Sequence, residues 1–235
     1  AWAWDAGSST VTNTDGSISS QVRANPSAGF SIVSWTGTGA TGSIGHGLNT
    51  KPSIVITKNR SISSVWVVDL IGVLSSGTDY MLLNSTQAAN SGGTTATSSV
   101  LNILQYSDRN GNGNNMLSYC FAPVESYSAM GSYVGNGSAD GPFVFTGMRP
   151  AFILIRSTGA GNWYLYDTAR EESNLTKNRL YPNLSNAEDS GTANSMDIVS
   201  NGFKLRSSHG GINLSGQTFI FMAFASHPFK TSRAR

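Results

Sequence analysis

The chain contains two copies of one sequence unit, and this repetition restricts the possible folds more than any other feature. Residues 30–39 match residues 128–137 at an offset of 98 positions, and residues 52–58 match residues 150–156 at the same offset. A repeat of about 100 residues is as long as a domain, so we expect each copy to form a lobe with its own core. Further matches at nearly the same spacing join Trp66 with Trp163 and residues 119–123 with residues 222–226.

A third, shorter echo lies at the start of the sequence, where the run Ala-Trp-Ala-Trp-Asp at residues 1–5 resembles the ends of both copies. We therefore predict that residues 1–28 comprise the terminal strand of a preceding module and a linker. Residues 29–126 are predicted to form the first lobe, and residues 127–235 the second. The alternative is that the short run at residues 1–5 pairs with the edge of the first lobe.

Apolar residues occur in short bursts, separated by clusters of Gly, Ser, Asn and Thr. The bursts are rich in Val, Ile, Phe, Tyr and Trp, and some alternate in polarity, as at residues 203–206. Both properties are typical of β-strands joined by polar turns, and helical periodicity is nearly absent. We predict an all-β protein with two tandem antiparallel lobes, each a β-sandwich or jelly roll, related by internal duplication.

Composition argues against several classes of partner. Fifteen Lys and Arg face 13 Asp and Glu, for a net charge of +2, and no basic cluster marks a nucleic-acid interface. No apolar run approaches the roughly 18 residues needed to span a membrane. Cys120 is the only cysteine, which rules out an internal disulfide and a cysteine-based metal site. Phosphate-loop and dinucleotide fingerprints are absent as well, so we expect no nucleic acid, no membrane and no cofactor.

The string from Asp108 to Asn114 resembles the front of a calcium-binding loop. Oxygen-bearing side chains alternate at Asp108, Asn110 and Asn112 before Gly113. The twelfth position of such a loop needs a bidentate Glu, and Tyr119 stands there instead. Asp108, Asn110 and Asn112 are therefore only a secondary metal candidate.

A structural interpretation of the same string is favoured by the repeat. Asn110 aligns with Asn213, and Gly113 aligns with Gly216, both at an offset of 103. The second string carries no acidic residue, yet it keeps the Asn and the Gly. We predict that both strings are hairpin turns, because Asn and Gly tolerate positive φ.

Histidines and carboxylates give no catalytic signature. His46 and His209 lie in glycine-rich segments, His227 lies near the end, and no Gly-x-Ser-x-Gly elbow accompanies them. The carboxylates at residues 171–172 and 188–189 are sequence neighbours, which point to opposite faces of a strand. We expect no catalytic residues.

One carboxylate is instead assigned a structural role. Asp167 aligns closely with Asp69, each after an aromatic-rich strand, and Arg170 is placed to pair with Asp167.

Aromatic residues divide into repeated and solitary ones. Trp35 matches Tyr133, and Trp66 matches Trp163, which favours core or packing roles. Aromatics present in one copy only are freer to lie at the surface, where Tyr beside Asn or Asp can stack on sugars. Sequence alone does not indicate which of them bind a ligand. These solitary residues are Tyr80, Tyr106, Tyr127, Tyr164, Tyr166 and Tyr181.

Several longer strings resemble a known family. They are residues 29–33, 45–48 with Pro52, 55–61, 119–122, 131–143, 146–150, 222–225 and 228–231. The whole resembles a domain common in predicted tail-fibre and other virion proteins of marine tailed bacteriophages. In that family the domain often follows concanavalin-like jelly-roll modules, whose last strand resembles residues 1–5.

This resemblance implies a non-enzymatic virion protein, a tail-fibre or appendage domain that serves assembly and host-surface attachment. The implied partners are other virion proteins, further copies of the chain in a homo-oligomer, with a trimer favoured, and a host-surface glycan. One alternative is a lectin-like module that recognises host glycans, and another is a capsid decoration protein. A glycan-cleaving enzyme would instead need two carboxylates roughly 5–9.5 Å apart in a cleft.

Overall fold

The computed structural model describes residues 2–225, and the chain divides into two compact units. The first unit comprises residues 1–83 and 90–123, and the second comprises residues 84–89 and the chain from Val124 onward. The boundary falls after Pro123, against the position after residue 126 expected from the repeat. His227 lies outside the described residues.

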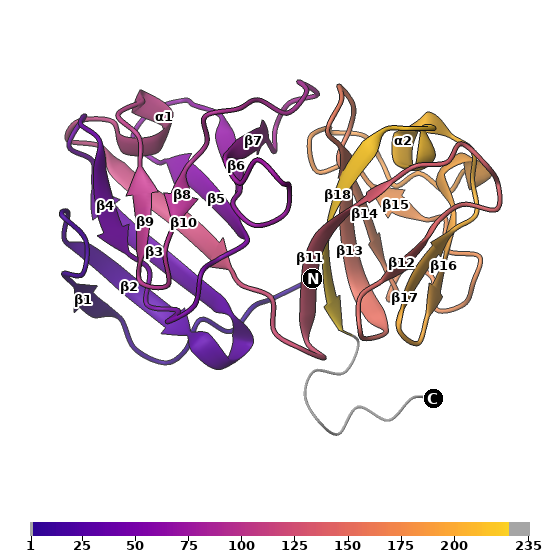
Figure 1. Ribbon diagram of the computed structural model, residues 1–235, viewed down its shortest axis with the longest axis horizontal. Coiled ribbons are helices and arrows are strands. Elements are labelled where there is room, and N and C mark those ends of the chain that lie inside the picture. The colour runs from indigo at the N-terminus through magenta and orange to yellow at the C-terminus, as the bar shows by residue number, and fades with distance from the viewer. Residues whose placement is uncertain (1, 226–235) are drawn as a thin grey trace. The chain divides into compact units, whose positions relative to one another are not determined.

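The first unit is built from two antiparallel sheets (Figure 1, indigo to magenta). The larger sheet has seven strands, in the order β1 (Val11–Asn13), β2 (Ser20–Asn25), β3 (Phe30–Thr36), β10 (Asn115–Phe121), β5 (Ile54–Asn59), β6 (Trp66–Leu70) and β7 (Asp79–Leu82). The smaller sheet has three, in the order β4 (Gly42–Gly45), β9 (Val100–Ile103) and β8 (Thr95–Ala96). Short helices η1 (Pro26–Ala28) and α1 (Ser107–Asn110) precede β3 and β10.

Alternating side chains of both sheets meet in one core. Val33 and Cys120 enter it from the larger sheet, and Ile44 and Leu101 enter it from the smaller one. Cys120 behaves as a small apolar side chain in this core, and burial raises the pKa of its thiol to about 12. The unit is therefore a β-sandwich, as predicted for an all-β fold.

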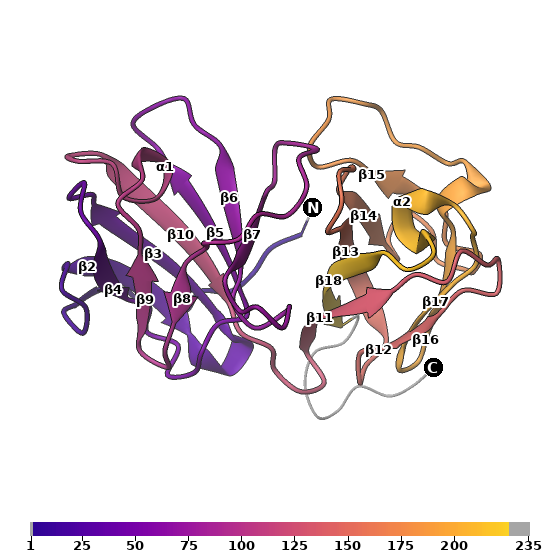
Figure 2. The same ribbon diagram turned by 45° about the horizontal axis from the view of Figure 1, so that its top comes forward.

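The second unit is a sandwich with the same plan (Figure 2, rose through orange to yellow). Its larger sheet runs β11 (Ser128–Val134), β18 (Thr218–Ala225), β13 (Pro150–Ser157), β14 (Tyr164–Asp167) and β15 (Arg179–Leu180). The smaller sheet runs β12 (Phe143–Phe145), β17 (Gly202–Leu205) and β16 (Met196–Val199). Two short helices, η2 (Thr192–Asn194) and α2 (Gly210–Asn213), precede β16 and β18. Its core includes Tyr133, Ile153, Phe203 and Phe219.

The two units share one strand order. The sheet β3-β10-β5-β6-β7 corresponds, strand for strand and in chain order, to β11-β18-β13-β14-β15, and β4-β9-β8 corresponds to β12-β17-β16. Helices α1 and α2 occupy the same place in chain order, immediately before the corresponding strands β10 and β18. Identical connectivity is the arrangement that a duplicated sequence predicts.

The first unit differs from this common plan at its beginning. Residues 2–10 contain no strand, and the Trp4 ring instead packs 6.4 Å from Phe30 and 6.0 Å from Phe121, measured between ring centroids. Residues 11–25, expected to be mostly linker, supply β1 and β2, and β2 pairs with β3 along the edge of the larger sheet. The sequence signal for a strand at residues 11–13 was weak, because β1 is largely exposed and has few apolar residues.

Candidate functional site

A buried asparagine fastens the short helix of the first unit to the end of β3. The side-chain oxygen of Asn110 accepts hydrogen bonds from Trp35 Nε1 at 3.0 Å and from the Thr38 amide at 3.2 Å. Its amide nitrogen donates to Thr38 Oγ1 at 3.0 Å and to the Ala40 carbonyl at 2.7 Å. Two hydrogen bonds accepted and two donated use the full capacity of the side chain, so its oxygen has no free position for a metal ion.

The second unit repeats this clamp. The oxygen of Asn213 accepts from the Asn136 amide at 2.8 Å, and its nitrogen donates to the Ser138 and Ser207 carbonyls, each at 2.8 Å. The backbone bond from Gly39 to Asn110 recurs as the bond from Gly137 to Asn213. Asn213 is fully buried. The asparagines aligned from the sequence therefore have one structural role in both units.

The prediction of hairpin turns in these strings was partly wrong. Residues 107–110 form helix α1, and only the following residues turn back. Gly113 and Gly216 adopt φ of +71° and +73°, the left-handed conformation that favours glycine. The repeat located the turn correctly but gave no sign of the single helical turn before it, which is too short to show a period.

Of the other two members of the metal candidate, Asn112 is exposed at the tip of this turn and Asp108 is half-buried on α1. The Oδ1 atom of Asp108 is buried and has no hydrogen-bond partner among the described residues. Within residues 2–225, no group of three or more His, Cys, Asp or Glu side chains is close enough to hold a metal ion. Asp108 belongs instead to a pocket.

This pocket lies within the first unit and has a volume of about 520 Å³. Four of its side chains carry the chemistry, namely Tyr80 on β7, Tyr106 immediately before α1, and Asp108 and Arg109 on α1. Loop residues 62–65 and 91–92 complete the wall. We name this feature the Tyr80–Tyr106 pocket.

An internal ion pair holds Arg109 in the wall of the pocket. Its Nη1 atom lies 2.5 Å from Asp69 Oδ1 and donates to Thr94 Oγ1 at 3.2 Å. Its guanidinium carbon lies 4.4 Å from the centre of the Tyr80 ring, within range of a cation–π interaction. Burial raises the pKa of Asp69, and the charge of Arg109 offsets part of this effect. Tyr80 is thus backed by a side chain that is itself fixed.

The register of the strands shows which residues replace this ion pair in the second unit. Val55 pairs with Asp69 in the first unit, and Ile153 pairs with Tyr166 in the second. Asp69 therefore corresponds to Tyr166, and Arg109, one residue before the clamp asparagine, corresponds to Ile212. Both replacements are buried core residues.

The predicted alignment of Asp69 with Asp167 was thus wrong by one position. Asp167 pairs with Phe152 and corresponds to Leu70, because β14 is one residue out of step with the offset of 98. Its predicted ion pair is confirmed, since Arg170 Nε lies 2.9 Å from Asp167 Oδ2. The Oδ1 atom also accepts two amide hydrogen bonds, from Ala169 and Arg170.

Tyr80 is also replaced in the second unit. The isolated bridge from Tyr80 to Asn90 recurs as the bridge from Arg179 to Asp189, so Arg179 stands in the place of Tyr80. There, Arg179 Nη2 lies 2.6 Å from Asp189 Oδ2, and the Tyr181 hydroxyl donates to the same oxygen at 2.6 Å. This region of the second unit is therefore occupied by a cluster of side chains bonded to one another.

The repeated tryptophans also keep one arrangement in both units. Lys58 Nζ lies 5.7 Å from the Trp66 ring, and the guanidinium carbon of Arg156 lies 5.2 Å from the Trp163 ring. Trp163 is buried and Trp66 half-buried, in line with the packing role expected for them. Burial lowers the pKa of Arg156 to about 10.

Solitary tyrosines are less exposed than the sequence suggested. Of the six, only Tyr106 is largely exposed, with 59% of its surface accessible, whereas Tyr164 and Tyr166 are buried. The Tyr166 hydroxyl donates to the Asn194 carbonyl at 2.8 Å inside the core. Tyr80, Tyr127 and Tyr181 are half-buried.

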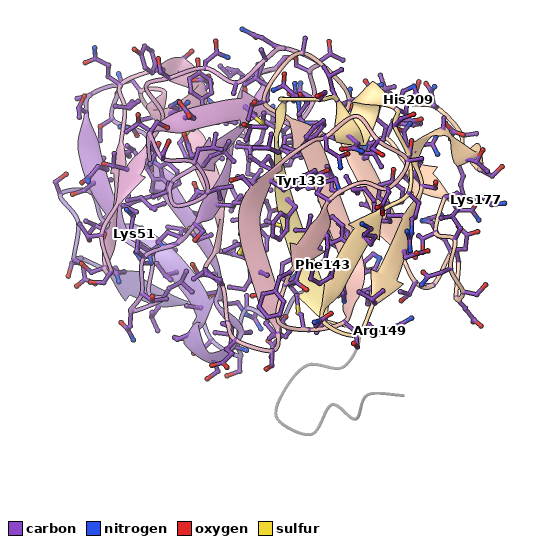
Figure 3. The ribbon with its side chains drawn as sticks, turned by 45° about the vertical axis from the view of Figure 1, so that its right-hand side comes forward. Lys51, Tyr133, Phe143, Arg149, Lys177 and His209 are labelled. Carbon is purple, nitrogen blue, oxygen red and sulfur yellow. The ribbon has the colours of Figure 1, made fainter. Side chains whose placement is uncertain are left out.

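The remaining sequence candidates have local partners. His46 is buried, and its Nδ1 accepts the Leu48 amide at 3.3 Å, so it stabilises a turn. His209, labelled in Figure 3, caps α2 by accepting the Gly211 amide at 3.1 Å. Glu171 accepts the Lys177 and Asn178 amides, and Glu188 pairs with Arg170.

Sequence reasoning missed the Asp69–Arg109 pair. The available signal was a charged residue beside the clamp asparagine where the other copy carries isoleucine.

The structure defines an all-β protein made of two sandwich units with the same connectivity. A family model described as Domain of unknown function (DUF7483) matches residues 1–228, and the chain belongs to this family. No curated protein and no solved structure matches the chain. Over residues 2–225, no helix has the length and apolar character needed to cross a membrane.

Proposed function

We propose that this protein is a non-enzymatic structural domain of a phage virion, in a tail fibre or similar appendage, that serves assembly and attachment to the host surface. The assignment to a virion is supported by the resemblance to tail-fibre and other virion proteins of marine tailed bacteriophages. Its partners would be other virion proteins, further copies of the chain and a glycan on the host surface.

One observation carries the non-enzymatic part of the proposal. The residues that recur in both units are committed to internal bonds, since Trp35 Nε1 donates to Asn110 and the Tyr133 hydroxyl donates to the Ile212 carbonyl at 2.8 Å. Repeated groups of this kind hold helix, turn and sheet together. A reactive centre would instead leave groups free to meet a substrate.

Low charge agrees with this role. Only 12% of the residues are charged, so repeated copies can pack without strong mutual repulsion, and seawater salt screens the remaining charges. A homo-oligomer, with a trimer favoured, follows from the resemblance alone.

The proposal is tested by electron microscopy of intact particles that carry an epitope tag on this chain. We expect antibody label on the tail or its appendages, with copy numbers in multiples of three. Label on the capsid surface would favour the decoration-protein alternative, and absence of the chain from purified particles would overturn the virion assignment.

A lectin-like function is the second candidate, and the Tyr80–Tyr106 pocket favours it. An exposed tyrosine ring beside a carboxylate is a typical combination for sugar recognition. The two candidates are compatible, because a structural appendage can carry a glycan-binding site.

A further inference from the structure

We infer that the Tyr80–Tyr106 pocket is a binding site for a neutral saccharide ring. The proposed attachment role supplies only the source of the sugar, a glycan on the host surface. The site itself is argued from the residues of the first unit.

Apolar surface for the sugar ring comes from the rim and the wall of the pocket. Tyr106 is 59% exposed and Ile62 is 44% exposed, and both line the pocket. Tyr80 lies deeper, and its ring is fixed by the guanidinium of Arg109. The C–H face of a pyranose stacks on such rings at little entropic cost, because a tyrosine side chain has few rotatable bonds.

Hydrogen-bonding capacity lies at the same place. Asp108 lines the pocket, and its buried Oδ1 atom lacks a partner among the described residues. The carboxylate of Asp108 can accept hydrogen bonds from sugar hydroxyls that enter the pocket. The pocket is also lined by four serines, whose hydroxyls can donate hydrogen bonds to a sugar and accept them from it, namely Ser63, Ser64, Ser91 and Ser107.

Charge selects a neutral sugar. Arg109 is matched by the buried carboxylate of Asp69, 2.5 Å away, which leaves Asp108 as the charge in the wall with no ion pair among the described residues. A negative wall disfavours acidic sugars. A quaternary ammonium ligand is disfavoured in turn, because the guanidinium of Arg109 already lies over the Tyr80 ring.

The second unit shows that the common scaffold does not require these residues. Tyr166 and Ile212 replace the buried ion pair there, and His209 and Gly211 stand in the places of Tyr106 and Asp108. A buried ion pair is seldom kept for stability, since apolar residues of similar size do as well. The first unit therefore retains a costly pair whose visible effect is to orient Tyr80 and Arg109 in the pocket wall.

Saturation-transfer NMR and amide chemical-shift titrations of the full chain test the inference, with free glucose, galactose, mannose and N-acetylglucosamine as probes. At least one of these sugars is expected to bind in the millimolar range, as is usual for single sugar rings at shallow sites. The perturbed amides should lie around α1 and β7.

Two substitutions localise the site. Tyr106→Ala and Asp108→Asn should each weaken binding about tenfold or more, while both proteins keep the wild-type amide spectrum elsewhere. Phe145→Ala is the matched control, since Phe145 is an exposed aromatic of the second unit, 66% accessible, and its loss should leave binding unchanged.

The inference is overturned if none of the four sugars binds, if binding survives both pocket substitutions, or if choline binds there in place of the sugars. Sugar binding by a chain that is missing from purified particles would support the site and refute the virion role. The two failures are therefore distinguishable.

Discussion

His46 is fully buried in the first unit, which makes its protonation state a matter of stability. Its Nδ1 accepts the Leu48 amide at 3.3 Å, and its Nε2 lies 3.3 Å from the Thr97 carbonyl, so the neutral ring with a proton on Nε2 satisfies both contacts. Burial lowers the pKa of His46 below its ordinary value of 6.5, although the Thr97 carbonyl and the charge of Asp15 act in the opposite direction.

Because the pKa of His46 is lowered in the folded chain, there is a pH range below 6.5 in which His46 is protonated in the unfolded chain and neutral in the folded chain. The contribution of neutral His46 to the free energy of unfolding is fully present above pH 6.5. It falls as the pH drops from 6.5 to the lowered pKa of the folded state, by at most about 1.4 kcal/mol per pH unit. Urea unfolding across this range should show the slope, and His46→Gln should reduce it. His209→Gln is the control, since that ring caps a short helix at the surface and its loss should leave the slope in place.

The buried pair of Asp69 and Arg109 gives a second prediction for individual residues. Arg109→Ala leaves a buried carboxylate without its cation and should destabilise the first unit by about 3–5 kcal/mol. The double change Asp69→Leu with Arg109→Met replaces both charges by apolar side chains and should return the free energy of unfolding to within about 1 kcal/mol of wild type. A double variant no more stable than Arg109→Ala would contradict this account.

Among the elements, α1 and the turn after it depend on one side chain. Asn110→Ala removes the acceptor for Trp35 Nε1 and the Thr38 amide and should cost about 2–3 kcal/mol, because the Trp35 donor stays buried and the two bonds donated by Asn110 are lost as well. Asn112→Ala, two residues along on the exposed turn, should change stability by no more than about 0.5 kcal/mol. Chemical denaturation compares the two, and equal effects would rule out the clamp.

Elements with strong alternation or matched copies were predictable from the sequence, and solitary weak ones were not. The bursts that became β3, β5, β13 and β18 carry runs of β-branched and aromatic residues. Strand β1 and helix α1 have no such signal, since their stability comes from neighbours in the fold. The pocket was partly visible, because Tyr106 and Asp108 were candidates for separate reasons. Only the three-dimensional contacts show that Arg109 lies between Asp69 and Tyr80.

For the molecule as a whole, two separate cores predict two unfolding events. Ile44→Ala acts on the first core and Ile153→Ala on the second, and both side chains are fully buried. Each substitution should lower the melting temperature of its own unit by about 8 °C or more and leave the other transition unchanged. Differential scanning calorimetry resolves the two events, and a single transition shifted by either variant would show that the units unfold together.

The clamp around Asn110 has a practical consequence. The Asn110 side chain and neighbouring main-chain bonds hold α1 against the end of β3, and they involve no residue of the loops at 62–64 and 91–92. These loops can therefore change in sequence without loss of the sandwich. A combinatorial library randomised at those loops, with Asn110 kept invariant, would give a compact disulfide-free starting material for selecting new affinity reagents.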